Sequence, residues 1–308
     1  MRRFNAVVAL VALVGSLALW GCSSSTSPSD VDDWWLGATW SGVADHPPGS
    51  YLGTAFLWDG DDTIYATRGG VDGFVRDFWT YSISSDAWTQ LGDVSFDPYW
   101  SCSMAWPGGD YIYVPQGNGT SAFYRYTIST DTWDSMADYP EDGVRRMGRS
   151  VVWPGSGDYI YAAKGNQEAT FFRYHIPSDA WEYLTPIPVA TVYGSSICWG
   201  GGGRIFAAVE GERFFEYRTS SDSWTEKAPY PAPIDFGSYL TFDGMESIFM
   251  TRGAETDTLW RYDIPTDEWE QLDNLPATLY RGAATVFADN ALYAVPGEYL
   301  MDFWVYKE

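Results

Sequence analysis

The stretch that decides the fold is "FFRYHIPSDAW", residues 171–181. Its first part is rich in aromatic residues, Pro, Ser and Asp follow, and the end resumes with Ala-Trp. This order is typical of two short strands joined by a tight turn. The same pattern returns as "FYRYTISTDTW" at 123–133 and "LWRYDIPTDEW" at 259–269. The chain is therefore expected to consist of repeated units.

Each copy of the repeat places a Trp seven positions after a Tyr. The pairs are Tyr81/Trp88, Tyr126/Trp133, Tyr174/Trp181, Tyr217/Trp224 and Tyr262/Trp269. The Trp residues recur every 43 to 48 residues. Internal periods of this length are typical of β-propellers, in which one repeat forms one blade.

Two further signals recur upstream of each Tyr. One is an aliphatic-aromatic step shortly before a Gly, as in "IYAAKG" at 160–165, and the other is a small residue five positions before an aromatic. Each period contains four β-rich runs separated by Gly, Asp and Ser. These residues indicate turns, because Gly adopts positive φ at little cost and Asp or Ser side chains hydrogen-bond to the nearby backbone. Four antiparallel strands, covered by neighbouring units on both faces, make a blade. The aromatic residues are expected to fill the wedge between blades.

The number of blades follows from the two ends of the repeat region. "DFWVYKE" at 302–308 matches "DFWTYSI" at 77–83, but Tyr306 has no Trp seven residues later. The missing Trp is Trp40, because "TWSGVADHPP" at 39–48 matches the segment that begins at Thr132. The N-terminal strand is therefore predicted to complete the last blade and remove a free sheet edge. The predicted fold is all-β, a six-bladed β-propeller of four-stranded antiparallel blades.

Residues 34–308 resemble the kelch-type β-propellers, whose repeats carry Tyr-x6-Trp after a glycine signal. The chain departs from that pattern in one respect. Kelch repeats usually carry a Gly-Gly doublet, and at that position only Gly69-Gly70 keeps it.

The first 21 residues have the features of an export signal. Arg2 and Arg3 precede an apolar run from Ala6 to Trp20, which is short for a spanning helix. The end of this run, "LWGC" at 19–22, resembles a bacterial lipobox, which implies lipidation of Cys22. The predicted organisation is a signal peptide (1–21), a Ser-rich tether (22–33) and the propeller (34–308). The expected location is the cell envelope, anchored by lipid and at the outer membrane.

The composition excludes several classes of partner. The net charge is −23 with three lysines, which argues against nucleic acid and against direct docking on anionic lipid. Membrane contact is thus expected only through the lipid anchor, and the protein is expected to be a monomer. Cys102 and Cys198 are predicted to be buried thiols, because their strands are two repeats apart.

Function is expected on the face where the central channel opens. Loops that join consecutive blades share this face with loops between the second and third strands. Many of the few Arg and Lys residues of the chain lie in these two sets of loops. Aromatic rings beside arginines suit a sugar or a carboxylate-bearing ligand. The candidate ligand-binding residues are Arg68, Trp100, Arg146, Lys164, Tyr193, Arg252 and Arg281.

No catalytic residue, metal ligand or cofactor is assigned. Kelch-type relatives include copper oxidases like galactose oxidase, but His46 and His175 are the only histidines and both fit packing or surface positions. The acidic stretch "WDGDDT" at 58–63 superficially suits calcium, but the same slot is a turn in every repeat. The prediction there is a hairpin.

We therefore expect a non-enzymatic binding or scaffold module whose partner is a glycan or an envelope protein. One alternative is a sugar-modifying enzyme, because the chain also resembles bacterial sialic acid mutarotases. That resemblance implies carboxylate-clamp and acid/base roles for Arg146, Arg281 and Glu210. The other alternative is a purely structural surface protein. The sequence leaves enzymatic activity open.

Overall fold

The computed structural model describes residue 35 and residues 37–47, 52–69, 75–98, 103–117, 120–140, 150–165 and 167–307. Residues 34–308 form one compact unit. The predicted signal peptide, the tether and Cys22 lie outside the described residues, and so do Cys102, Trp100 and Arg146. In the described part of the chain, no helix is both long and apolar enough to cross a membrane.

The described strands form six antiparallel sheets. Blade 1 contains β2 (Ala55–Trp58), β3 (Thr63–Thr67), β4 (Phe78–Ser82) and β5 (Ala87–Gln90). Blade 2 contains β6 (Tyr111–Pro115), β7 (Phe123–Thr127) and β8 (Thr132–Met136), and blade 3 contains β9 (Val151–Val152), β10 (Tyr159–Ala163), β11 (Phe171–His175) and β12 (Ala180–Tyr183). Blade 4 contains β13 (Ser196–Trp199), β14 (Arg204–Val209), β15 (Arg213–Arg218) and β16 (Ser223–Lys227).

Blade 5 contains β17 (Ser238–Phe242), β18 (Ser247–Arg252), β19 (Leu259–Asp263) and β20 (Glu268–Gln271). Blade 6 contains β21 (Ala284–Ala288), β22 (Ala291–Val295), β23 (Trp304–Lys307) and β1 (Thr39–Gly42). In blade 2 the innermost position is held by a bridge between Ala105 and Tyr113. Two 3-10 turns, η1 (Ile128–Thr130) and η2 (Ile176–Ser178), join the third and fourth strands of blades 2 and 3.

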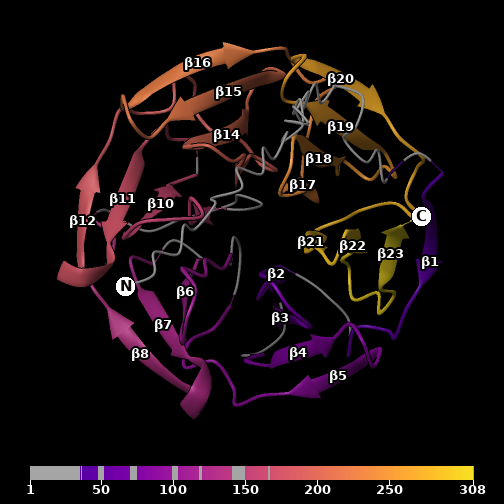
Figure 1. Cartoon of the computed structure of the whole chain (residues 1–308), viewed down its shortest axis with the longest axis horizontal. Coiled ribbons are helices and arrows are strands. Elements are labelled where there is room, and N and C mark those ends of the chain that lie inside the picture. The colour runs from indigo at the N-terminus through magenta and orange to yellow at the C-terminus, as the bar shows by residue number, and fades with distance from the viewer. Residues whose placement is uncertain are drawn as a thin grey trace, which may run out of the picture. The chain divides into compact units, whose positions relative to one another are not determined.

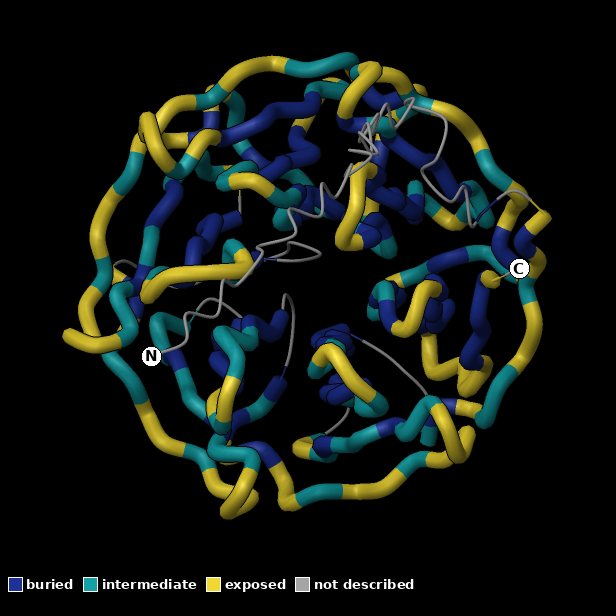
Figure 2. Tube along the Cα trace, in the orientation of Figure 1, coloured by how far each residue is buried: buried dark blue, intermediate teal, exposed yellow. Residues whose placement is uncertain are grey.

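The six sheets stand around a central axis, with the first strand of each nearest the axis and the fourth at the circumference (Figure 1). Burial follows this radial order. The second strand β10 is buried at four of its five positions, whereas the outermost strand β12 has no buried residue, as the exposed rim in Figure 2 shows. The six-bladed, all-β prediction is confirmed.

Aromatic side chains fill the wedge between neighbouring blades, as predicted. Phe123 of blade 2 meets Tyr174 and Trp181 of blade 3 edge-on, with ring centroids 5.0 Å apart in both cases. Phe171 meets Tyr217 and Trp224 of blade 4 in the same way, at 4.9 and 5.1 Å. These contacts explain why Tyr and Trp recur together, because both cover the first aromatic of the preceding blade's third strand.

The turn after each repeated Tyr also ties one blade to the next. Asp179 adopts a left-handed backbone (φ 49°) and its carboxylate accepts the Tyr174 hydroxyl at 2.7 Å. The same oxygen accepts the backbone N–H of Ala137, in the preceding blade, at 2.7 Å. Trp181 then donates its indole N–H to the Ala137 carbonyl at 2.8 Å. The Tyr-to-Asp bond recurs at Asp86, Asp131, Asp222 and Asp267.

The ring closes where the sequence predicts. β1 pairs antiparallel with β23, and Trp40 lies opposite Tyr306 with ring centroids 5.0 Å apart. Trp35, just before β1, contacts blade 5, because the Arg261 guanidinium of β19 lies over its ring, with Cζ 3.7 Å from the ring centroid. β1 starts at Thr39 opposite Lys307, so both ends of the described unit lie on the face of the turns between first and second strands.

Candidate functional site

The channel-mouth face is defined here by two kinds of loop, those entering the first strand of a blade and those between its second and third strands. Within one blade the two loops are hydrogen-bonded, as Ala254 N–H donates to the Phe236 carbonyl at 3.0 Å. Glu298 N–H donates likewise to the Arg281 carbonyl at 3.0 Å. The prediction that both loop sets share a face therefore agrees with these contacts.

Glycines set the spacing between the entering loops. Gly194 has φ +78°, and a Cβ added there would lie 2.2 Å from the Asp235 carbonyl oxygen of the next blade. At Gly237 (φ +88°) an added Cβ would lie 2.7 Å from the backbone carbonyl oxygen of Tyr280. Only glycine permits both this conformation and this approach. The loops of blades 4, 5 and 6 therefore touch backbone to backbone.

This spacing stacks three side chains from corresponding positions of consecutive blades. The Tyr193 and Phe236 rings are 4.6 Å apart and inclined by 23°, which is a stacked pair. The Arg281 guanidinium lies over the Phe236 ring, 4.7 Å from its centroid. Tyr193 and Phe236 are half-buried and Arg281 is exposed. The result is a row of flat groups across three blades.

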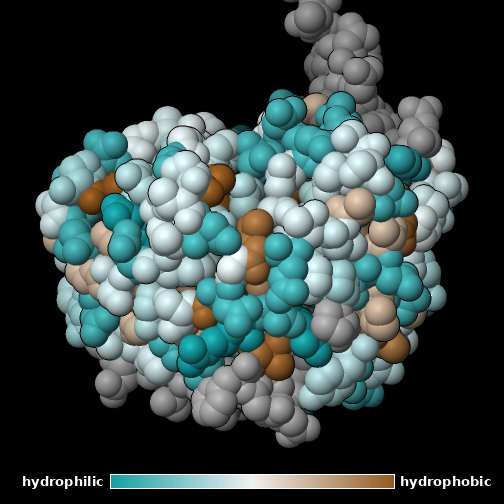
Figure 3. Space-filling model, turned by 90° about the horizontal axis from the view of Figure 1, so that it is seen from below, coloured by the Kyte–Doolittle hydropathy of each residue, from teal (hydrophilic) through white to brown (hydrophobic). Residues whose placement is uncertain are grey.

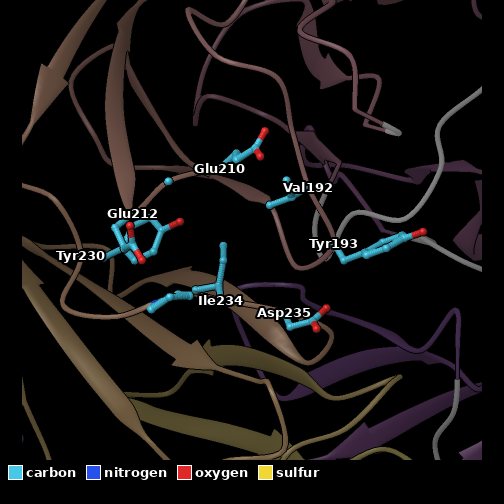
Figure 4. A pocket seen from close by; sticks show the side chains of 9 residues that line it. Val192, Tyr193, Glu210, Glu212, Tyr230, Ile234 and Asp235 are labelled. Carbon is cyan, nitrogen blue, oxygen red and sulfur yellow. The ribbon is translucent and has the colours of Figure 1, made fainter.

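Hollow A lies beside the Tyr193 end of this row and has a volume of about 270 Å³. In Figure 4, Glu210 and Val192 lie across the hollow from Ile234 and Asp235. Burial raises the pKa of Tyr230, whose hydroxyl donates to the Val209 carbonyl. Hollow A is lined by Val192, Tyr193, Glu210, Gly211, Glu212, Tyr230, Pro233, Ile234 and Asp235.

Hollow B adjoins it at Asp235 and has a volume of about 400 Å³. Each hollow is near the lower end of small-molecule sites, which span about 300–1,000 Å³. Two of its carboxylates come from residues with left-handed backbone, Glu255 (φ 56°) and Glu298 (φ 54°), in corresponding loops of blades 5 and 6. Hollow B is lined by Asp235, Phe236, Ala254, Glu255, Tyr280, Arg281 and Glu298.

The predicted ligand-binding residues that are described fall into two groups. Tyr193 and Arg281 lie in the row and line the hollows. Arg68 instead forms an ion pair with Asp77 at 2.9 Å, and Lys164 with Glu168 at 2.8 Å. Arg252 donates from Nε to the Pro233 carbonyl at 3.1 Å. Trp100 and Arg146 lie outside the described residues and stay predictions.

Of the carboxylates that line the hollows, the sequence predicts a role for Glu210, through the acid/base function that the resemblance to sialic acid mutarotases implies. Glu210 and Glu298 adjoin the recurrent Gly in loops between second and third strands, so the repeat puts both on this face, but it does not predict that they gather with Asp235. Glu255 was missed altogether. A signal for it exists, because Glu212, Glu255 and Glu298 each follow the recurrent Gly by one or two residues and each has positive φ.

Two groups considered for metal binding have other roles. Asp59 caps a hairpin, since its carboxylate accepts the backbone N–H groups of Asp61 and Thr63 at 2.9 and 3.1 Å. His46 is fully buried against Trp88 and Phe56. Among the residues that the structure describes, no group of three His, Cys, Asp or Glu side chains is arranged to hold a metal ion.

Comparisons with known proteins show the fold alone. No family model matches the chain. No curated protein matches it by sequence. The solved structure titled "Structure of YjhT" is similar, with TM-score 0.66, 12% identity, and 87% of this chain and 96% of that chain covered. A structural genomics protein of unknown function from Bacteroides thetaiotaomicron is also similar, with TM-score 0.64, 11% identity, and 88% and 76% coverage.

Proposed function

We propose that the channel-mouth face of blades 4, 5 and 6 binds carbohydrate, and that the protein acts as a non-enzymatic binding module. The Tyr193 ring, which lines hollow A and stacks on Phe236, carries this proposal. Sugar rings present apolar faces that pack on aromatic rings, while their hydroxyls need hydrogen-bond acceptors. The row offers aromatic area, and the adjoining hollows offer carboxylate oxygens from Glu210, Asp235 and Glu298.

A glycan array followed by titration of the full-length protein tests the proposal. Tyr193→Ala is expected to weaken binding of the identified glycan about fivefold or more, because the loss of one stacking aromatic ring costs about 1–3 kcal/mol in complexes with nucleobases. Tyr183→Ala is the matched control, since Tyr183 is an aromatic with 58% exposure on the outermost strand of blade 3. Equal affinity of the Tyr193→Ala variant and the wild type would show that the site lies elsewhere.

A sugar-modifying enzyme is the second candidate, and hollow B favours it. Asp235, Glu255 and Glu298 share that hollow with the Tyr280 side chain, and carboxyl groups are common general acids and bases in sugar chemistry. Magnetisation-exchange NMR on a bound sugar distinguishes the two functions. Anomeric exchange that is faster with protein, and slowed by Glu298→Gln, supports the enzyme.

We propose that the module is displayed at the cell envelope through lipid on Cys22. The charged start, the apolar run and the Gly-Cys order of residues 2–22 support this. Metabolic labelling with palmitate tests it in cells producing wild-type and Cys22→Ala protein. Label in both proteins, or in neither, contradicts the proposal.

We further propose kelch-type ancestry and a monomeric state. The Tyr-x6-Trp spacing, with both rings in the wedge between blades, supports the first. The side of the molecule shown in Figure 3 supports the second, because its hydrophobic residues form small separate patches among hydrophilic ones. Light scattering of the purified protein tests the monomer, and a profile of homologues that aligns each Trp with the kelch Trp tests the ancestry.

A further inference from the structure

The two hollows are strongly acidic. Five carboxylates line them, and Arg281 is the one cationic side chain among their lining residues. The carboxylates are Glu210, Glu212, Asp235, Glu255 and Glu298. A cluster of this sign beside an aromatic row does not suit an anionic ligand, because each carboxylate repels it.

Two of the other three described cations that were predicted on this face are paired with carboxylates, and the third, Arg252, donates from Nε to the Pro233 carbonyl beside hollow A. Arg68 and Lys164 are each paired with a carboxylate, at 2.9 and 2.8 Å. The whole chain adds to the effect with its net charge of −23. A field of one sign concentrates ligands of the opposite sign near a concave surface.

The aromatic row already accommodates a cation. The Arg281 guanidinium lies 4.7 Å from the Phe236 centroid, which is a cation–π contact. A protonated amine is another cation for which an aromatic face and carboxylate oxygens are suitable partners. Tyr193 and the carboxylates that line the hollows thus match a ligand that combines a sugar ring with an ammonium group.

We propose that this site is selective for amino sugars with a free, protonated amine, and that it prefers them to N-acetylated and to acidic sugars. This inference rests on the proposed carbohydrate-binding function. The sugar ring packs against Tyr193 in hollow A and the ammonium lies among the carboxylates. Because hollows A and B share Asp235, neighbouring units of an oligosaccharide reach both.

The test compares ligands that differ only in charge. Isothermal titration of the full-length protein uses oligomers of glucosamine, of N-acetylglucosamine and of a uronic acid, with the glucosamine monomer as a fourth ligand. The glucosamine oligomer is expected to bind most tightly, more tightly than its monomer. Its affinity is expected to fall as salt rises, because the interaction is between exposed charges.

Two variants test the role of charge directly, because one removes a negative charge from the site and the other removes a positive charge. Glu298→Gln is expected to weaken glucosamine oligomer binding about threefold, the effect of one charge about 6 Å away in a water-like medium. Arg281→Ala is expected to strengthen it, because it removes the competing cation. Glu268→Gln is the matched control, since Glu268 is exposed on β20, outside both hollows. The control is expected to bind like the wild type.

The outcomes separate the two proposals. If the N-acetylated or uronic oligomer binds at least as well as the glucosamine oligomer, the amine selectivity is wrong and carbohydrate binding stands. Weaker glucosamine binding by Arg281→Ala also overturns the selectivity. If none of the oligomers binds, the carbohydrate proposal fails for these sugar classes, and the selectivity fails with it.

Discussion

His46 is a polar residue in a position that the other blades give mainly to aromatic or aliphatic side chains. Tyr139, Ile187 and Leu275 occupy the corresponding slot six residues after the repeated Trp. The His46 side chain is fully buried, and neither ring nitrogen has a hydrogen-bond partner among the described residues. Burial and the nearby Arg68 charge lower its pKa to about 3.

This residue makes stability depend on pH. The unfolded chain takes up a proton on His46 below a pKa of about 6.5, whereas the folded protein does so near 3. Between these values the unfolded state binds more protons, so the free energy of unfolding falls as pH falls. The loss reaches about 2 kcal/mol at pH 5. His46→Leu is expected to remove this loss, measured by urea denaturation between pH 7 and pH 5.

The second histidine provides the control for that measurement. His175 is half-buried and its Nδ1 lies 2.7 Å from the Ser178 hydroxyl. His175→Gln should keep the pH dependence of the wild type. A His46→Leu variant that loses stability as steeply as the wild type over this range contradicts the assignment.

The entering loops are the elements that build the site, and their geometry depends on glycine. In the Gly194→Ala variant the new methyl group would meet the Asp235 carbonyl at 2.2 Å. The loops of blades 4 and 5 must then separate, in addition to the strain of φ +78°. We expect a loss of about 2 kcal/mol or more in the free energy of unfolding, measured by denaturation, and a weaker site.

A second glycine separates the clash from the strain. Gly244 has a similar φ of +81°, and a Cβ added there would meet nothing within 4 Å. Gly244→Ala should therefore cost about 1 kcal/mol and leave ligand affinity unchanged. Equal effects of the two substitutions on stability and on affinity would show that loop contact does not shape the row.

At the level of elements, the sequence predicts which face a loop residue lies on better than it predicts which side chains that residue contacts. Tyr193, Phe236 and Arg281 occupy one position of the repeat, so their alignment on one face follows from the period. That Phe236 lies between the other two follows from backbone contact between loops, which no spacing reveals. Similarly, the repeat places Arg68 and Lys164 on this face, but their pairing with Asp77 and Glu168 depends on how each individual loop folds.

At the scale of the whole molecule, ring closure was predictable because it repeats a local rule. Trp40 and Tyr306 form a Tyr–Trp pair although they are far apart in the sequence. Their rings pack together as those of the other Tyr–Trp pairs do within one blade. The repeat accounts for the positions of Glu212, Glu255 and Glu298 after the recurrent Gly, but not for their gathering with Glu210 and Asp235. Asp235, Glu255 and Glu298 come from three loops of different length and residue content, and loops lie outside the repeated packing constraint.

The antiparallel pairing of Thr39 with Lys307 has a practical corollary for handling the protein. An affinity tag or a sensor-chip linker joined at Lys307 attaches on the face opposite the channel-mouth face, which carries Tyr193 and Arg281. In a protein immobilised in this way, hollows A and B face the solution. Soluble saccharides can then bind there without obstruction by the support.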